Sequence, residues 1–157
     1  MQFFNQKTFV LIIPVLLAVL FYLVRKVIAS IKRKRAEELF TNYHKDRIIY
    51  FSKEVNFFGQ ESAGRAQMRG NGSLLLTPDE LHFLRWIPKK DIIIPLNDIE
   101  NIERVNSFLG KKKNNELLKV EFNNHQGKKD SAAWLLDNMH AWEQVIKDNL
   151  ENKSNDY

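Results

Sequence analysis

The sequence contains no cysteine, only six glycines and four prolines among 157 residues, and no acidic residue before position 36. The absence of cysteine excludes a disulfide framework and agrees with a reducing compartment. No segment repeats along the chain, which argues against solenoid and propeller architectures. What is present is a long apolar run, a cluster of basic residues and a series of short strand-like segments.

Motifs for catalysis and metal binding are also absent from the sequence. No G-x-S-x-G elbow presents a nucleophile. The histidines occur singly, without the H-x-x-x-H or H-E-x-x-H spacing of a metal site: His44, His82, His125 and His140. We expect His82 to be a surface or rim residue of a strand, and Asp79 and Glu80 to serve a turn rather than acid–base chemistry. The sequence therefore predicts no enzyme, no metal and no other cofactor.

The first long feature is an uncharged run, "TFVLIIPVLLAVLFYLV", at residues 8–24. As a helix it would span roughly 26 Å, whereas a bilayer core is about 30 Å thick. Apolar residues up to position 28 supply the difference, and a proline is tolerated in such a helix. We expect a membrane helix over residues 8–28. The alternative is a cleaved signal sequence, which the basic segment "IKRKR" directly after the weak cleavage candidate "VIAS" disfavours.

Basic residues are unequally distributed around this run. Lys7 is the one basic residue before it, and six follow within residues 25–35: Arg25, Lys26, Lys32, Arg33, Lys34 and Arg35. Positive charge marks the cytoplasmic side, so these six residues predict a single-pass protein of the cell membrane with residues 1–7 outside and the large C-terminal part in the cytoplasm. Residues 36–157 carry 17 basic and 19 acidic residues. That net charge of −2 argues against nucleic acid as a partner.

Beyond the membrane helix we expect a basic amphipathic stalk at residues 29–46, a domain at 47–150 and a disordered tail at 151–157. Within the domain, alternating apolar residues and turn signals predict a series of short strands. The strand candidates are residues 47–52, 65–69, 73–77, 80–86, 91–96, 99–105, 117–122 and 130–136. We interpret residues 53–64 as an ordered loop, Asn71-Gly72 as a hairpin turn, Pro78-Asp79 as a second turn and residues 110–116 as a loop.

The last element has a helical pattern. Asp137 can cap a helix whose apolar residues Met139, Trp142, Ile146 and Leu150 recur at spacings of three and four. Its apolar stripe has to be buried, and the open end of a small antiparallel barrel is the available place. The fold class predicted is mainly β: a transmembrane helix and stalk, then a small antiparallel barrel or sandwich of about seven strands, capped by a C-terminal helix.

Two segments and the final helix carry a resemblance to a known family. The segment "GSLLLTPDELHF" at residues 72–83 is similar to a G-x-L-x-L-T-x-x-x-L-x-F pattern, and "IIIPLNDIENIE" at 92–103 is similar to I-P-L-x-x-I-x-x-I. With the helix that contains Trp142, they resemble the GRAM-like and bacterial PH-like branch of the pleckstrin-homology superfold over residues 60–150. The resemblance implies a PH-like barrel. The basic K-x-n-R-x-R arrangement of phosphoinositide-binding members is not matched, because the first hairpin offers only Arg65 and Arg69.

Two basic turns have no assigned role in this fold. They contain Lys89 and Lys90, and Lys111, Lys112 and Lys113. Ordinary solvated loops are one interpretation. Contact with the anionic leaflet is the other, because each basic residue near that surface contributes about 1 kcal/mol. We expect a membrane-anchored binding or scaffold module that engages a protein partner through a groove or strand edge of the barrel. An anionic-lipid sensor that uses these five lysines is the alternative, and a membrane-tethered enzyme is a third, weaker one.

Overall fold

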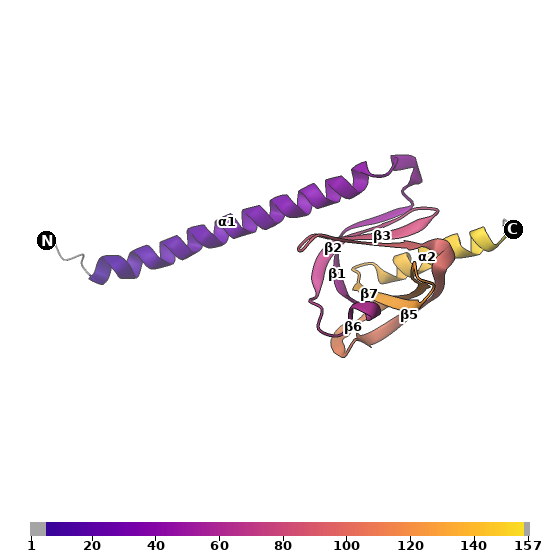
Figure 1. The fold of residues 1–157 in the computed structure, drawn as a ribbon. Coiled ribbons are helices and arrows are strands. Elements are labelled where there is room, and N and C mark those ends of the chain that lie inside the picture. Colours follow the sequence, from indigo (N-terminus) through magenta and orange to yellow (C-terminus); the bar gives the residue numbers. More distant parts are fainter. Residues whose placement is uncertain (1–5, 156–157) are drawn as a thin grey trace. The chain divides into compact units, whose positions relative to one another are not determined.

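The computed structural model describes residues 6–155, with side chains over residues 12–153 except that of Lys113 (Figure 1). It contains two α-helices and seven strands: α1 Gln6–Thr41, β1 Tyr50–Gln60, β2 Gly70–Leu76, β3 Glu80–Arg85, β4 Lys90–Pro95, β5 Ile99–Phe108, β6 Lys111–Asn123, β7 Lys129–Leu135 and α2 Met139–Asn155. Three short 3-10 helices are η1 Lys45–Arg47, η2 Glu61–Ala63 and η3 Leu96–Asp98. Strands predominate, as predicted. The chain divides into two compact units, Met1–Lys34 and Arg35–Tyr157, and we call the second the sheet unit.

The first unit is helical and apolar. Within the described residues, α1 is one helix that is long and apolar enough to cross a membrane, with Pro14 inside it. Its large apolar side chains, Leu16, Leu20 and Phe21 among them, are exposed. A signal sequence near the N-terminus would meet the same criteria of length and composition.

The described strands of the sheet unit form one antiparallel sheet in the order β4-β3-β2-β1-β7-β6-β5. Strand β1 pairs with β2 through Tyr50–Phe57 and with β7 through Asn56–Gln60, so it is shared by both halves of the sheet. The two edge strands, β4 and β5, are joined only by the three residues of η3. Since three residues span at most about 11 Å, the sheet has to curl back on itself and enclose a core.

That core is sealed by α2, which lies across the opening of the curled sheet (Figure 1). The helix begins after Asn138, whose carbonyl accepts a hydrogen bond from the Trp142 amide at 3.2 Å. Trp142 and Ile146 are fully buried among residues of the strands, and Trp142 Nε1 donates to Ser52 Oγ at 2.8 Å. The predicted apolar stripe of the final helix is confirmed, and it closes the barrel-like sheet.

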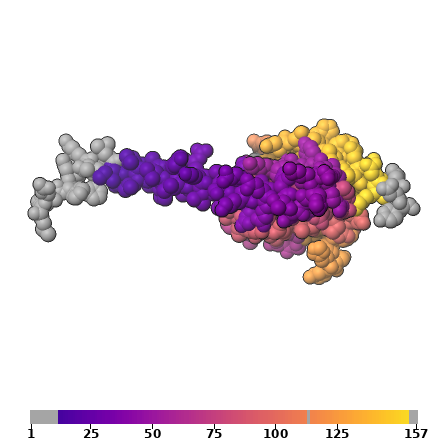
Figure 2. All heavy atoms as spheres, turned by 90° about the horizontal axis from the view of Figure 1, so that it is seen from above, coloured from indigo at the N-terminus to yellow at the C-terminus, as the bar shows by residue number. Residues whose placement is uncertain are grey.

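The outer face of β2 and β3 is also buried. Leu75 and Leu84 point away from the main core and pack against Leu39, near the end of α1. The space-filling view shows atoms of this segment covering one face of the sheet unit (Figure 2). We call residues 35–43 the docked segment. Strand β3 alternates two buried faces for this reason, as its sequence predicts for a strand contacted on both sides.

Three predictions between residues 53 and 72 are wrong. Residues 53–60 belong to strand β1 instead of a loop, and Asn71-Gly72 lies inside β2 instead of forming a hairpin turn. The glycine is needed for close approach: a Cβ atom on Gly72 would collide with the carbonyl oxygen of Leu84 and the ring of Phe83. Residues 65–69, predicted as a strand, form a turn and irregular chain.

Other boundaries also differ from the prediction. Residues 111–116 extend β6, and the loop before it shrinks to Leu109 and Gly110, which both have positive φ. Helix α1 ends at Thr41, earlier than the predicted stalk. Helix α2 continues to Asn155, so residues 151–155 of the predicted disordered tail are helical. Residues 1–5 of the predicted outer stub and residues 156–157 lie outside the described residues.

Candidate binding site at the β4 edge

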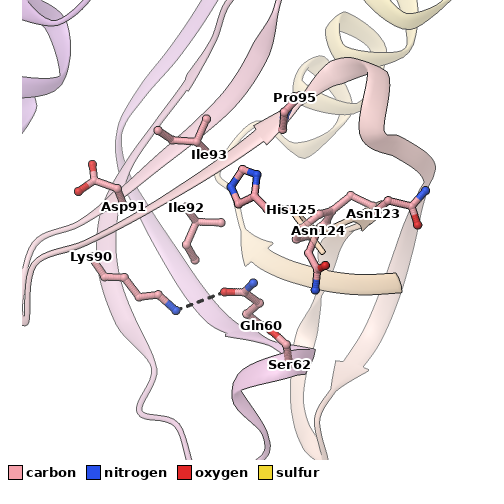
Figure 3. A pocket seen from close by; sticks show the side chains of 11 residues that line it. Gln60, Ser62, Lys90, Asp91, Ile92, Ile93, Pro95, Asn123, Asn124 and His125 are labelled. Carbon is pink, nitrogen blue, oxygen red and sulfur yellow. Dashed lines mark hydrogen bonds between the residues drawn. The ribbon is translucent and has the colours of Figure 1, made fainter. Parts of the chain in front are cut away.

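A pocket of about 300 Å³ lies between strand β4 and the hairpin of β6 and β7 (Figure 3). Strand β4 contributes Lys90, Ile92 and Ile93, and the hairpin contributes Phe122 and His125. Gln60 and Ser62 close the remaining side. The pocket therefore combines an apolar wall with amide, hydroxyl, ammonium and imidazole groups and the Asp91 carboxylate, all of which can form hydrogen bonds to a bound segment.

A buried carboxylate fixes the wall formed by the end of β1. Asp130 is 3% exposed and accepts hydrogen bonds from Gln60 Nε2 at 2.6 Å, from the Ser62 amide at 2.9 Å and hydroxyl at 2.6 Å, and from the Ser131 amide at 2.8 Å. Burial by itself would raise the pKa of Asp130, but these hydrogen bonds favour the charged form more strongly and lower the pKa below its ordinary value. The charge thus holds η2 against β7.

The charged residues on and just before β4 have different partners. Asp91 Oδ1 lies 2.9 Å from Nε2 of His82, and Lys89, just before the strand, forms an ion pair with Glu38. Lys90 Nζ lies 3.3 Å from the Gln60 side-chain oxygen (Figure 3). Among the described residues Lys90 has no carboxylate partner within salt-bridge distance. It is therefore the cation that the pocket can offer to an acidic ligand group.

The two edges of the sheet differ in accessibility. Among the described strands, β4 pairs only with β3 and β5 only with β6. The β5 edge is tied to α2, because Arg104 Nε donates to Glu143 at 2.6 Å and Lys147 holds the same carboxylate at 2.7 Å. The β4 edge lines the pocket instead, and Ile93 on it is 41% exposed. This edge is the place where another backbone could pair.

The five lysines predicted to face lipid do not form one uniform cluster. Lys89 is neutralised by Glu38, whereas Lys111 is partly buried and donates to the backbone carbonyls of Gln67 at 2.7 Å and Phe58 at 3.4 Å. Lys90 lines the pocket and Lys112 is exposed. The side chain of Lys113 lies outside the described residues.

His82 is not a rim residue, contrary to the sequence prediction. It is 4% exposed, because the docked segment covers its side of β3. Of the six basic residues after the apolar run, Arg35 forms an ion pair with Glu38 at 2.6 Å and Arg25 lies over the Phe21 ring at 5.7 Å. The orientation that they predict stays a prediction.

Asp130, Gln60 and Ser62 were not identified as site residues from the sequence. Asp130 lies about seventy positions from Gln60 and Ser62, and a single aspartate at the start of a strand has no distinguishing pattern. Only the pairing of β1 with β7 brings them together.

Comparison with known proteins identifies the fold alone. No protein-family model and no curated protein matches the chain. Among solved structures, the C-terminal domain of an unknown protein from Leishmania infantum is 17% identical, with a TM-score of 0.47 over 78% of this chain and 98% of that one. A chain of the 8S snRNP assembly intermediate is 7% identical, with a TM-score of 0.54 over 69% of this chain and 85% of that one.

Proposed function

We propose that this chain is a membrane-anchored, PH-like binding module of the GRAM-like type, whose sheet unit faces the cytoplasm and engages a protein partner along strand β4. The observation that carries the proposal is the β4 edge beside the pocket, which among the described strands pairs only with β3. An edge strand presents a row of backbone donors and acceptors to which an extended peptide can add as a further strand.

The pocket supplies what backbone pairing lacks, which is selectivity. Main-chain hydrogen bonds give affinity with little dependence on sequence, whereas pockets for side chains give specificity. Here Ile92 and Phe122 provide an apolar wall, and Lys90 is a cation without an acidic partner among the described residues. We therefore expect the bound segment to carry an apolar residue next to an acidic one.

Membrane anchoring fits a binding function. The apolar part of α1 is long enough to span a bilayer, and the excess of six basic residues after it favours a sheet unit on the cytoplasmic side. A tethered module meets membrane-bound partners at a raised effective concentration, so a weak edge contact is sufficient for association.

Site-specific photo-crosslinking of the full chain in cells tests the proposal. A photoreactive amino acid at Ile93, on the exposed β4 edge, should give a discrete adduct with a protein. The matched control is the same amino acid at Asp148, which is exposed on α2. Lys90→Glu should weaken the Ile93 adduct by repelling an acidic segment. Equal adducts at both positions, or none at Ile93, would exclude the β4 edge as the binding surface.

Lipid binding is the second candidate, and one observation favours it. Met68 and Ile87 are 71% and 56% exposed on the segments that precede β2 and follow β3, and Lys89 and Lys90 follow Ile87 after Pro88. Exposed apolar tips beside basic residues suit the interface of an anionic membrane.

Vesicle binding separates this candidate from the first. The sheet unit, residues 35–157, should bind vesicles rich in phosphatidylserine and not neutral ones, and binding should disappear in about 0.5 M salt. Substitution of Lys111, Lys112 and Lys113 by glutamine should abolish binding at low salt, and the Lys111→Gln variant alone shows how much stability is lost with the hydrogen bonds to the Gln67 and Phe58 carbonyls. Vesicle binding by the triple variant equal to that of the parent would identify these lysines as ordinary surface residues.

A further inference from the structure

A chain of hydrogen bonds lies beneath the docked segment. The Tyr43 hydroxyl donates to the Glu80 carboxylate and lies 2.7 Å from Nδ1 of His82. On the other side of the ring, Nε2 of His82 lies 2.9 Å from Asp91 Oδ1. Tyr43 comes from the docked segment, whereas the other three side chains come from β3 and β4. This series of hydrogen bonds therefore joins the docked segment to the sheet.

The number of protons required by these contacts can be counted. Three hydrogen bonds need three hydrogen atoms, and ionised carboxylates supply none. A neutral tyrosine supplies one and a neutral histidine supplies one. Because the tyrosine proton is used toward Glu80, Nδ1 has to donate to the tyrosine oxygen and Nε2 has to donate to Asp91. All three hydrogen bonds can therefore form only when the network holds one proton more than it has with a neutral histidine, a neutral tyrosine and two ionised carboxylates.

We propose that the Tyr43–Glu80–His82–Asp91 network is a proton-binding site, and that its extra proton holds the docked segment against the sheet. The proton belongs to the coupled network, and its main form has His82 as an imidazolium between the Asp91 carboxylate and the tyrosine oxygen. This inference goes beyond the proposed partner binding and does not rest on it, although Asp91 also lines the pocket beside β4.

The surroundings of His82 favour this charge state. The charged groups that face the ring are Glu80 on β3 and Asp91 on β4, while β2 offers only Leu75 opposite His82. The nearby cations are engaged elsewhere, Lys89 with Glu38 and Arg47 with Asp79. Burial and the bond to Glu80 raise the pKa of Tyr43, so the tyrosine keeps its proton. Two carboxylates thus compensate one buried imidazolium.

Loss of the proton has a direct structural consequence. One of the three contacts then lacks a hydrogen atom, and two lone pairs face each other in a place with little water. Release of the docked segment relieves this repulsion and exposes Leu39, Leu75 and Leu84. The chain between Lys34 and Tyr50 then becomes a flexible connection with a reach on the order of 20 Å. The network would therefore set how far the sheet unit extends from the end of the apolar helix.

The sign of the pH effect follows from proton linkage. The docked state holds one proton more than the released state, so docking is favoured at lower pH, as long as the carboxylates stay ionised. The docking equilibrium changes by at most about tenfold for each pH unit when one proton is linked.

Hydrogen exchange on the full chain in lipid nanodiscs tests the proposal. After correction for intrinsic exchange, protection of the amides of residues 35–43 should fall about tenfold or more between about pH 5.5 and pH 8.5. Amides of β6 and β7 serve as the internal control and should not change. Tyr43→Phe keeps the ring but removes the bridging hydroxyl, and it should abolish the pH dependence, whereas His44→Gln at the exposed neighbouring histidine should retain it.

A second measurement does not depend on any variant. Nitrogen NMR of the histidine rings in the unmodified chain should show both His82 nitrogens protonated at about pH 5.5 and one deprotonated when the docked segment loses protection. Protection that is constant over this range, a Tyr43→Phe variant that retains the pH dependence, or a His82 ring that is neutral while the segment is protected would each overturn the proposal.

Discussion

Trp142 joins the final helix to the sheet through its aromatic ring and through its indole N–H group. Its ring is buried against Tyr50 in an edge-to-face contact at 4.8 Å, and its Nε1 donates to Ser52. Trp142→Ala should lower the free energy of unfolding by about 3 to 5 kcal/mol in urea titrations of residues 35–157. Gln144→Ala, on the exposed side of α2, is the control and should change it by less than about 0.5 kcal/mol. A loss under about 1 kcal/mol for Trp142→Ala would mean that α2 is not docked.

Gly72 shows that a turn-like dipeptide can serve close packing inside a strand. Gly72→Ala should destabilise the sheet unit by about 1 to 3 kcal/mol, because its methyl group would meet the backbone of Leu84 and the ring of Phe83. Gly70→Ala is the matched control, since a methyl group there meets chiefly the flexible Arg85 side chain. Equal unfolding midpoints for the two variants would contradict this account.

The elements that the sequence predicted well are those in which the spacing of apolar residues is regular throughout. Strand β3 and the core-facing residues of β6 alternate cleanly, and α2 keeps its helical spacing. Only the start of strand β1 was predicted, because register shifts between Ser52 and Val55, and between Phe57 and Gly59, break the alternation after it. The polar start of β6 was missed for a related reason: both faces are largely exposed there, so no apolar pattern marks the strand.

The candidate site was predictable in part. Lys90 stood out as a basic residue next to a strand, and a strand edge was expected to bind. The wall around Asp130 and the network around His82 depend on contacts between residues far apart in sequence, for which one sequence gives no signal. The amphipathic pattern of residues 35–43 predicts an apolar face, but it does not tell which surface that face covers.

The docked segment makes the end of α1 part of the sheet unit. A fragment that starts at residue 45 lacks Leu39 and Tyr43 and exposes Leu75 and Leu84. It should therefore be about 2 to 5 kcal/mol less stable than residues 35–157, the range for loss of a buried leucine. Leu39→Ala in the longer fragment should reproduce most of this loss in urea titrations. Equal stability of the two fragments would show that the segment is not docked.

The charge of the whole chain is unevenly divided between the segment next to the apolar run and the sheet unit. The net charge is +5, yet residues 36–157 carry −2, so the basic character comes from the segment next to the apolar run. A sheet unit with a slight negative charge is not drawn to an anionic leaflet as a whole. In the proposed function its β4 edge is the surface for a protein partner, and the basic segment is expected to orient the apolar helix.

Orientation is the property on which the proposed function depends most. One basic residue precedes the apolar run and six follow it within residues 25–35, and such an imbalance predicts that the following part of the chain lies in the cytoplasm. A protease recognition site appended after Tyr157 should stay intact when the protease is added to whole cells or spheroplasts, and it should be cut once the membrane is permeabilised. The same site placed ahead of Met1 is the control and should be cut in both conditions. Cleavage after Tyr157 in intact spheroplasts would place the β4 edge outside the cell, where no cytoplasmic partner could reach it.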